Sequence, residues 1–189
     1  MTSEKPIAET VKAELVQGNI IVWNIEDGRK LYKLGYYGKP LGISKPKTAD
    51  FNAPLILDII EAVYLVEKGI LEVYEDDKVL GLEELMERAE EYYENFKEKY
   101  LVYRDLRERG FIVTPGIKFG SDFAIYKVGP GLEHAPFIVQ VKLLGEQISA
   151  LEIVRSGRLA TTVRKYFTIA VPDLNKSEAM YILFEWWRA

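Results

Sequence analysis

The sequence predicts an α+β protein with a mixed α/β content, and three features of the chain indicate this class. Its 189 residues are enough for one ordinary domain or for two small ones. Stretches rich in β-branched and aromatic residues lie near both ends of the chain, and two stretches with helical periodicity lie between them. We place a domain boundary between these two helical stretches, near Tyr92. The predicted domains are therefore residues 1–92 and 93–189.

The first domain is predicted to contain strands and a helix. Residues 14–25 are rich in Ile, Val and Trp and predict a strand region, and residues 26–28 (Glu-Asp-Gly) predict a turn after it. Residues 55–68 place aliphatic side chains on one broad face, which predicts a helix that stops at Gly69. A short strand is predicted over residues 71–74.

Two helices are predicted around the domain boundary. Residues 82–98 form the first, and its runs of Glu predict a solvent-exposed acidic face. The second covers residues 100–109 and ends at Gly110.

The second domain is predicted to consist mainly of strands, with one helix before the last two strands. Asp122 stands nearly alone among the acids of this part and reads as a loop or capping residue. The predicted strands are residues 111–114, 117–119, 123–128, 137–144, 166–171 and 180–187, the helix is 149–164, and a loop covers 172–177.

The last predicted strand is apolar on both faces, which indicates that both faces are covered. Exposed Trp186 or Trp187 side chains would be unfavourable in a chain of this size. The cover can come from another subunit, from the core of the same domain, or from both.

The composition excludes several kinds of site. The chain has no cysteine, which excludes disulfides, thiolate metal sites and cysteine nucleophiles. His134 is the single histidine, which excludes zinc sites built on two or three imidazoles. We see no signal-peptide pattern and no apolar run long enough to cross a bilayer. We therefore expect a cytoplasmic protein without a membrane contact and without a cofactor.

The charge is distributed unevenly along the chain. The formal net charge is −4, with −7 on residues 1–100 and +3 on residues 101–189. Residues 155–165 contain four basic side chains and no acidic one. Such a segment is either a solvated basic helix face or a place where a phosphate backbone can bind, because local charge governs docking of a polyanion.

Four segments of the second half resemble the catalytic domain of the archaeal and eukaryotic tRNA-splicing (tRNA-intron) endonucleases. Two further segments, residues 31–40 and 61–69, resemble the N-terminal domain of that family. The four segments are Tyr-Arg-Asp-Leu-Arg-Glu-Arg-Gly at 103–110, Lys-Phe-Gly-Ser-Asp-Phe-Ala-Ile-Tyr at 118–126, His-Ala-Pro at 134–136 and Arg-Leu-Ala-Thr-Thr-Val-Arg-Lys at 158–165.

The resemblance implies a small N-terminal α/β domain and a C-terminal nuclease domain with helices flanking a mixed central sheet. It also implies an enzyme that excises introns from precursor tRNA at bulge–helix–bulge splice sites, using Tyr, His and Lys and no metal. The matching positions are Tyr126, His134 and Lys165, which lie eight and 31 residues apart. Where relatives often have His in the last motif, this chain has Thr161.

The three side chains suit cleavage by the RNA's own 2′-hydroxyl. We assign Tyr126 as general base, His134 as general acid and Lys165 as the cation that stabilises the phosphorane. The products would be a 2′,3′-cyclic phosphate and a 5′-hydroxyl. Because a free tyrosine has a pKa of about 10, we expect the Lys165 ammonium to lower the pKa of Tyr126 as well.

Two arginines are candidate RNA contacts. Arg158 matches a family position implied to form an arginine pair around a flipped-out base, and guanidinium groups stack well on unpaired bases. Arg188 is our candidate for the second arginine. Arg158 and Lys165 are seven residues apart, which predicts that they project from one side of a helix.

Family members are implied to form tetramers, with subunits joined through their C-terminal strands. In homotetramers an acidic loop before the last strand is implied to insert into a neighbouring subunit. Here that loop, residues 172–178, is only mildly acidic and contains Lys176. This difference favours a heterotetramer with a separate structural subunit over a homotetramer.

Three other interpretations stay open at this point. Each of Tyr126, His134 and Lys165, taken alone, can be an ordinary packing or surface residue. The chain could be a non-catalytic structural subunit of the same complex, although such a subunit has no need for all three side chains. A metal-dependent nuclease would need clustered carboxylates or imidazoles near Asp122.

Overall fold

The structure is a computed structural model that describes residues 10–43, 46, 48–117 and 120–185. The chain divides into two compact units, Met1–Glu94 and Asn95–Ala189. The sequence-based boundary near Tyr92 lies shortly before this division, at the end of helix α3 (Leu82–Tyr92).

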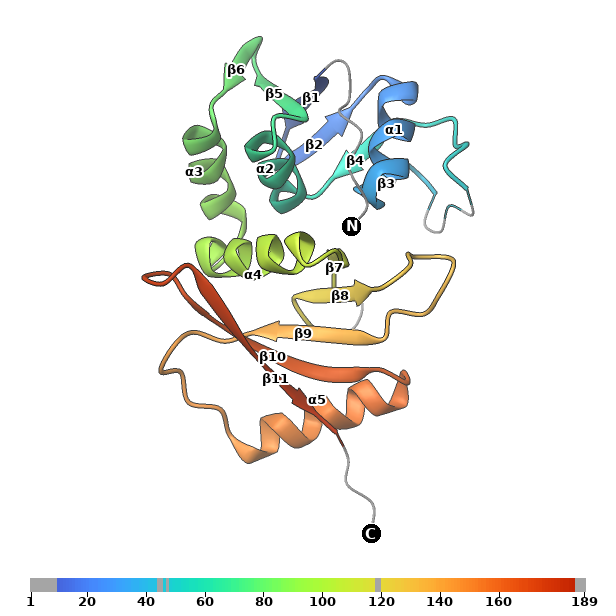
Figure 1. Cartoon of the computed structure of the whole chain (residues 1–189). Coiled ribbons are helices and arrows are strands. Elements are labelled where there is room, and N and C mark those ends of the chain that lie inside the picture. The colour runs from blue at the N-terminus through green and yellow to red at the C-terminus, as the bar shows by residue number, and fades with distance from the viewer. Residues whose placement is uncertain (1–9, 44–45, 47, 118–119, 186–189) are drawn as a thin grey trace. The chain divides into compact units, whose positions relative to one another are not determined.

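Within its described residues, the first unit contains a six-stranded mixed sheet and three helices (Figure 1). The strand order is β3-β4-β2-β1-β5-β6, and β1 and β5 pair in parallel while the other pairs are antiparallel. The strands are β1 (Val11–Val16), β2 (Asn19–Val22), β3 (Lys39–Pro40), β4 (Leu55–Leu57), β5 (Leu71–Glu75) and β6 (Lys78–Leu80); the helices are α1 (Ile25–Gly35), α2 (Ile59–Glu67) and α3.

The predicted turn at residues 26–28 is wrong, because these residues form the first turn of α1. The Asn24 side chain caps the helix by accepting a hydrogen bond of 3.1 Å from the Asp27 backbone nitrogen. Acidic residues in the first turn favour the positive end of the helix dipole. Gly28 suggested a turn, but it is buried, and a Cβ atom there would lie 3.0 Å from Leu55 Cβ. Its role is close packing.

The predicted helix over residues 55–68 is correct only from Ile59 onward. The first three residues form β4, and Asp58 begins the helix with a capping box in which the Glu61 side chain accepts from the Asp58 backbone nitrogen. At the other end Gly69 has φ +68°, which is the left-handed conformation that stops a helix. The strand predicted over residues 71–74 is confirmed as β5.

The predicted acidic helix over residues 82–98 is two helices. α3 ends at Tyr92, and the second unit begins with Asn95, whose φ of +54° breaks the helix. Helix α4 (Phe96–Glu108) follows and contains the predicted second helix almost completely.

The second unit is built on a mixed sheet of five described strands in the order β11-β10-β9-β8-β7. β9 and β10 pair in parallel, and the other pairs are antiparallel. The strands are β7 (Ile112–Pro115), β8 (Phe123–Tyr126), β9 (Phe137–Val141), β10 (Tyr166–Asp173) and β11 (Glu178–Phe184); the second helix is α5 (Ala150–Thr162).

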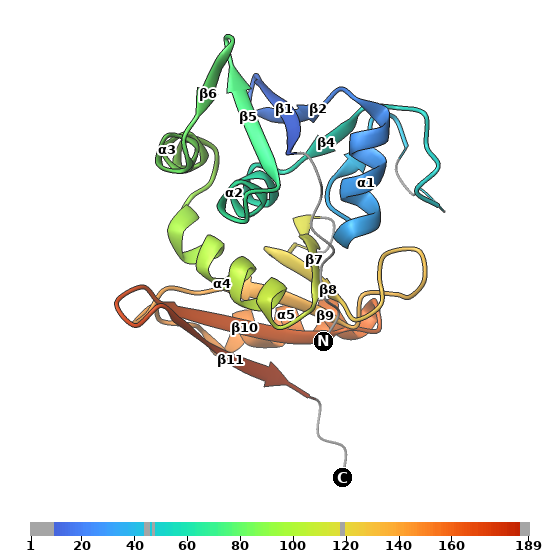
Figure 2. The same cartoon turned by 45° about the horizontal axis from the view of Figure 1, so that its top comes forward.

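Helices α4 and α5 lie on opposite faces of this sheet (Figures 1 and 2). Beneath α5, Ala160 packs with three strand residues, Ile138, Phe167 and Ile169. α4 contacts β7, β9, β10 and β11 and contributes the fully buried Tyr103, whose ring lies 5.9 Å from that of Phe123. The α+β class and the helix-flanked mixed sheet are therefore confirmed.

Several predicted bounds in the second unit are too long or too short. β8 and β9 end earlier than predicted, at Tyr126 and Val141, and β10 runs through Pro172 to Asp173 instead of giving way to a loop. Ile117 lies in a short 3-10 turn, and the other two residues of the strand predicted at 117–119 lie outside the described residues.

The last strand, β11, is not covered on both faces within the chain. Met180, Ile182 and Leu183 are 61%, 43% and 48% exposed. One link ties the strand to α4, where the Tyr181 hydroxyl donates a 2.6 Å hydrogen bond to Asp105. A fully buried core strand is therefore wrong for the isolated chain. Trp186 and Trp187 lie outside the described residues.

Candidate active site

Three adjacent strands bring the predicted trio to one end of the second sheet. The register pairs Ile125 of β8 with Phe137 of β9, and Phe137 with Tyr166 of β10. One position closer to this end of the sheet, the three neighbouring residues are Tyr126, Pro136 and Lys165. We call these three residues the row. Because neighbouring strands are about 4.8 Å apart, the Tyr126 and Lys165 backbones lie roughly 10 Å from each other. His134 lies outside this row, two residues before Pro136 in the loop that leads into β9.

Lys165 is placed in this row by the way helix α5 ends. The Arg164 N–H donates to the Thr161 carbonyl at 3.0 Å and the Lys165 N–H to the Ala160 carbonyl at 2.8 Å, which is a Schellman ending. Arg164 takes the left-handed conformation that glycine usually provides, with φ +55°. The chain thus reverses between the helix and β10, and Lys165 stands at the turn.

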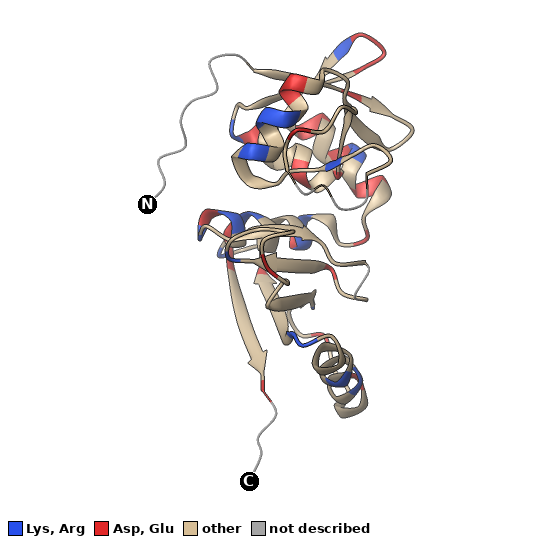
Figure 3. Cartoon of the chain, turned by 90° about the vertical axis from the view of Figure 1, so that its right-hand side faces the viewer, with Lys and Arg blue, Asp and Glu red and all other residues tan. Residues whose placement is uncertain are grey.

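The reversal at Arg164 makes one prediction wrong. Arg158 and Lys165 do not share a helical face, because α5 ends at Thr162 and Lys165 follows the left-handed residue. Arg158 is exposed on the helix, and Figure 3 marks Lys and Arg positions in blue along the ribbon. Arg188 lies outside the described residues.

Lys165 and the His134 segment are joined directly. The Lys165 Nζ donates a 2.6 Å hydrogen bond to the carbonyl of Ala135, the residue after His134. The Tyr166 N–H donates to the Pro136 carbonyl at 2.8 Å, which continues the same pairing. His134 itself is exposed, so its imidazole is accessible to a ligand.

Tyr126 is half-buried, and its environment works against ionisation. Burial raises its pKa above the ordinary value of 10, a hydrogen bond with the Thr114 side chain lowers it, and the charge of Glu133 raises it further. The net direction is upward. Lys165 is not among the groups that shift this pKa, so the expectation that Lys165 lowers it is wrong for the free chain.

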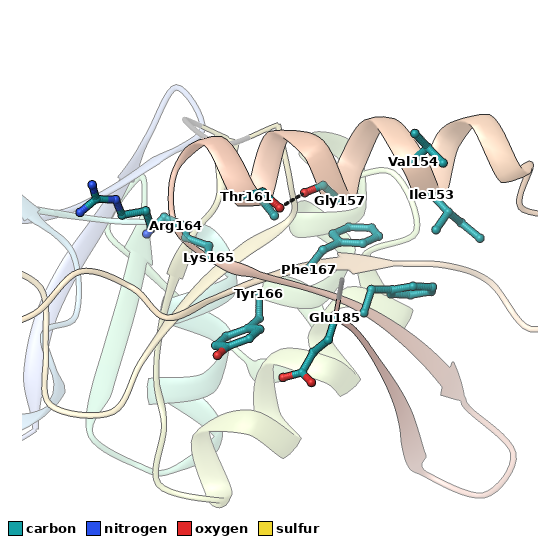
Figure 4. A pocket seen from close by; sticks show the side chains of 11 residues that line it. Ile153, Val154, Gly157, Thr161, Arg164, Lys165, Tyr166, Phe167 and Glu185 are labelled. Atoms are coloured by element: carbon teal, nitrogen blue, oxygen red, sulfur yellow. Dashed lines mark hydrogen bonds between the residues drawn. The ribbon is translucent and has the colours of Figure 1, made fainter. Parts of the chain in front are cut away.

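A pocket of about 590 Å³ opens beside the row (Figure 4). Lys165 belongs to both the row and the pocket, and Figure 4 shows it between Arg164 and Tyr166 at the end of α5. Thr161, at the position where relatives often have His, donates to the Gly157 carbonyl at 2.8 Å. The pocket is otherwise mostly apolar, with Ile153, Val154, Ala160, Phe167 and Phe184 as its aliphatic and aromatic lining and Glu185 at its edge.

Asp122 has a structural role in the sheet. One carboxylate oxygen accepts a 2.8 Å hydrogen bond from the Val141 backbone nitrogen, and the other lies 3.0 Å from the Lys99 ammonium. It therefore ties β9 and α4 to the start of β8, as a loop or capping residue does. In the described part of the chain, no group of three or more His, Asp or Glu side chains is arranged to hold a metal ion.

The sequence analysis missed two residues that shape this site. Thr114 acts on the Tyr126 hydroxyl from the neighbouring strand β7, and Glu133 acts on it from the loop before His134. The chain offered a signal for Glu133, which directly precedes the single histidine. Thr114 could not be found without the register of β7 and β8.

The geometry as a whole defines a class of site. A tyrosine, an exposed imidazole and an ammonium group meet at one end of a mixed sheet, next to a helix with exposed basic side chains. These are the groups needed for acid–base cleavage of a phosphodiester that carries its own nucleophile. Among the described residues, no helix has the length and apolarity that crossing a bilayer requires.

The chain belongs to the tRNA intron endonuclease family. Residues 96–180 match the family model for the catalytic C-terminal domain, and residues 11–86 match the model for the N-terminal domain. This confirms the resemblance seen in the sequence and assigns the chain to a family of enzymes.

Relatives agree along nearly the full length. The chain is 47% identical to a tRNA-splicing endonuclease of Hyperthermus butylicus over 177 residues, covering 93% of this chain and 98% of that protein. It is 47% identical over 174 residues to one of Sulfurisphaera tokodaii, covering 92% and 97%. A Saccharolobus islandicus tRNA-splicing endonuclease is 43% identical over 178 residues, covering 93% and 98%.

Proposed function

We propose that this chain is an endoribonuclease that excises introns from precursor tRNA, cutting at splice sites of the bulge–helix–bulge type without a metal ion. The observation that carries the proposal is the row of strand ends that brings Tyr126, the His134 segment and Lys165 together in the family's catalytic domain. A non-catalytic subunit would not need these three side chains at one end of the sheet.

Each residue has one role in the reaction. Tyr126 accepts the proton of the 2′-hydroxyl, whose oxygen attacks the adjacent phosphorus. The bond from phosphorus to the 5′-oxygen breaks, and His134 donates a proton to that oxygen. Lys165 stabilises the charge on the non-bridging oxygens between these events. The products are a 2′,3′-cyclic phosphate and a 5′-hydroxyl, and the two proton transfers balance.

The raised pKa of Tyr126 has a kinetic consequence. Burial raises the pKa of Tyr126, which favours the neutral phenol over the phenolate. A base that must first ionise gives a rate that rises with pH until its pKa is reached. We therefore expect cleavage to accelerate through the alkaline range as long as chemistry is the slow step.

RNA binding is assigned to the basic segment around α5. Arg158 is exposed and lies four residues before the end of α5 at Thr162, and Arg188 is the proposed second contact. Guanidinium groups can stack on an unpaired base of a bulge while also contacting phosphates.

The assembly is proposed to be a heterotetramer with a separate structural subunit. β11 is the edge strand of its sheet and exposes Met180, Ile182 and Leu183, which suits a dimer contact through the C-terminal strand. In the loop before β11, Asp173 accepts from the backbone nitrogens of Asn175 and Lys176 and lies 3.5 Å from the Lys176 ammonium. The loop's charge is thus partly neutralised internally, which argues against insertion as an acidic arm.

The test is cleavage of an intron-containing precursor tRNA in EDTA, by the chain alone and with a candidate structural subunit. The proposal requires cleavage in EDTA with 2′,3′-cyclic phosphate and 5′-hydroxyl ends. Cleavage by the chain alone would contradict the heterotetramer. Loss of activity in EDTA that returns with a divalent ion, or products with 3′-hydroxyl ends, would contradict the chemistry.

A further inference from the structure

The loop between Tyr126 and His134 is closed by one side chain. Glu133 Oε1 accepts hydrogen bonds from the backbone nitrogens of Lys127 at 2.5 Å and Val128 at 2.6 Å. The Glu133 backbone N–H in turn donates to the Gly129 carbonyl at 3.2 Å. The last residue of the loop is therefore fastened to its first three residues through both its side chain and its backbone.

This clamp is adjacent to both proposed proton-transfer residues. Lys127 directly follows Tyr126, and Glu133 directly precedes His134. On the other side of His134, the Ala135 carbonyl accepts the Lys165 hydrogen bond. His134 thus lies between two fixed residues, although its own side chain is exposed.

The Glu133 carboxylate is the contact that joins the end of the loop to the backbone next to Tyr126. The hydrogen bond from the Leu132 N–H to the Gly129 carbonyl, at 3.3 Å, and the bridge between Pro130 and Glu133 connect residues further along the loop. The antiparallel pairing of β8 and β9 extends to Ile125 and Phe137, and the residues between these strand ends are held by loop contacts. A catalytic group displaced by about 1 Å can lose about 100-fold in rate. The connection from Lys127 to Glu133 therefore sets the position of one catalytic residue relative to the other.

We propose that Glu133 is a positioning residue, whose carboxylate holds the loop so that His134 and Tyr126 face the same phosphodiester. The proposal rests on the proposed function, because it assigns Glu133 a role in that reaction. Glu133 does not touch the reacting atoms in this assignment and acts through its neighbours.

The charge of Glu133 has a second, opposing effect. It raises the pKa of Tyr126, after the larger effect of burial. The other charged or titratable groups around the Tyr126 end of the sheet are Lys127, His134 and Lys165. Glutamine at position 133 would keep an oxygen that accepts both N–H groups but would carry no charge, whereas alanine would remove the acceptor and the charge together.

The experiment compares Glu133→Ala and Glu133→Gln in single-turnover cleavage of precursor tRNA, in the assembly in which the wild-type chain cleaves. We expect E133A to lower the cleavage rate constant by about 100-fold. The concentration that gives half of the maximal rate should change little. We expect E133Q, which keeps the acceptor oxygen, to cleave at least as fast as the wild type and to move the rise of the pH–rate profile to lower pH. The matched control is Glu146→Ala, which removes a similar loop carboxylate at the opposite end of β9, where Glu146 accepts from the Leu143 backbone nitrogen at 2.9 Å.

The outcomes separate this proposal from the proposed function. Wild-type rates in E133A would overturn the positioning role. A folded E133Q variant that is slowed about 100-fold would overturn it too, because glutamine keeps the acceptor oxygen, and this readout applies even where E133A fails to fold. If Tyr126→Phe, His134→Ala and Lys165→Ala all cleave like the wild type, the proposed chemistry fails first. A slow E146A equal to E133A would show general loop damage and would also overturn the proposal.

Discussion

The two ends of strand β9 use the same device for different purposes. At each end a glutamate accepts hydrogen bonds from loop backbone nitrogens, Glu133 before the strand and Glu146 after it. Glu146 also pairs with Lys142 at 2.8 Å, and Lys142 reaches Glu152 of α5 at 2.7 Å. Glu133 instead acts on the pKa of Tyr126.

The difference shows how a structural device becomes part of a reactive site. At the far end, the carboxylates raise the pKa of Lys142, and the charges satisfy one another. At the near end, Lys165 donates to the neutral Ala135 carbonyl, and its ammonium stands in the row with Tyr126. We therefore expect the Glu146 carboxylate to have no part in the reaction and the Glu133 carboxylate to affect proton transfer.

The largest expected effect separates the two lysines. Lys165→Ala should reduce the cleavage rate constant by about 100-fold to 1,000-fold, as loss of a preorganised charge at the transition state does. Lys142→Ala should leave it within about twofold, because Lys142 lies at the other end of β9 and pairs there with Glu146 and Glu152. Single-turnover cleavage of precursor tRNA measures both variants. Equal rate losses in Lys165→Ala and Lys142→Ala would contradict a functional difference between the two ends of β9.

The next effect concerns Tyr126 and the shape of the pH–rate profile. For the wild type we expect the logarithm of the rate to rise with pH through the alkaline range, since burial raises the pKa of Tyr126. Tyr126→Phe should lower the rate about 100-fold or more and remove this rise. Tyr92→Phe, on the exposed end of α3, is the matched control. A wild-type profile that levels off near neutral pH would contradict a raised pKa in the working enzyme.

A smaller effect shows how far the RNA-binding surface extends along α5. Arg158→Ala should weaken binding of precursor tRNA by about 10-fold, the loss expected for one stacked base contact. Arg155→Ala, three residues nearer the far end and also exposed, should change it less. Binding of uncleaved RNA over a range of salt concentrations measures both. A larger loss of affinity for Arg155→Ala would contradict the assignment, because it would place the RNA contact nearer the N-terminus of α5 than Arg158.

The smallest effect is on stability at the far end of β9. The pKa of Glu146 is lowered, first by Lys142 and then by the Leu143 backbone, so the folded state favours the ionised form. The Glu146 carboxylate therefore stabilises the folded state above its ordinary pKa of 4.5. This stabilisation is lost as the pH falls through the lower pKa that the group has in the folded state. Glu146→Gln should therefore reduce stability at pH 7 by less than about 1 kcal/mol. Thermal unfolding should show this difference at pH 7, and it should shrink below pH 4.5; a difference that grew in acid would contradict the sign.

Much of the fold was predictable because local signals and tertiary structure agree. Strand β5 follows from its composition, and the end of α2 follows from Gly69, which takes the left-handed conformation. The predicted helix over 82–98 fails between Tyr93, which is extended, and Asn95, which is left-handed, because helical periodicity continues across this short break. The strand β4 was missed because three apolar residues before a helix fit either pattern.

The sequence proposes members of the site and says less about their environment. Family motifs single out Tyr126, His134 and Lys165, while the strand register places Tyr126 and Lys165 in one row and His134 two residues before it. The assumed effect of Lys165 on Tyr126 failed, because burial dominates the pKa and burial cannot be read from a motif. The common face of Arg158 and Lys165 failed because Arg164, a non-glycine residue, ends the helix in the left-handed conformation.

The most direct test of the account is a substrate whose 5′-oxygen leaving group at the splice site is replaced by sulfur. A thiolate leaves without protonation, so a general acid no longer contributes. His134→Ala should lower cleavage of the normal precursor tRNA by about 100-fold or more and should cleave the sulfur-substituted RNA at nearly the wild-type rate. An equal loss on both substrates would contradict the assignment of His134 as the acid and, with it, the proposed division of roles among the three residues.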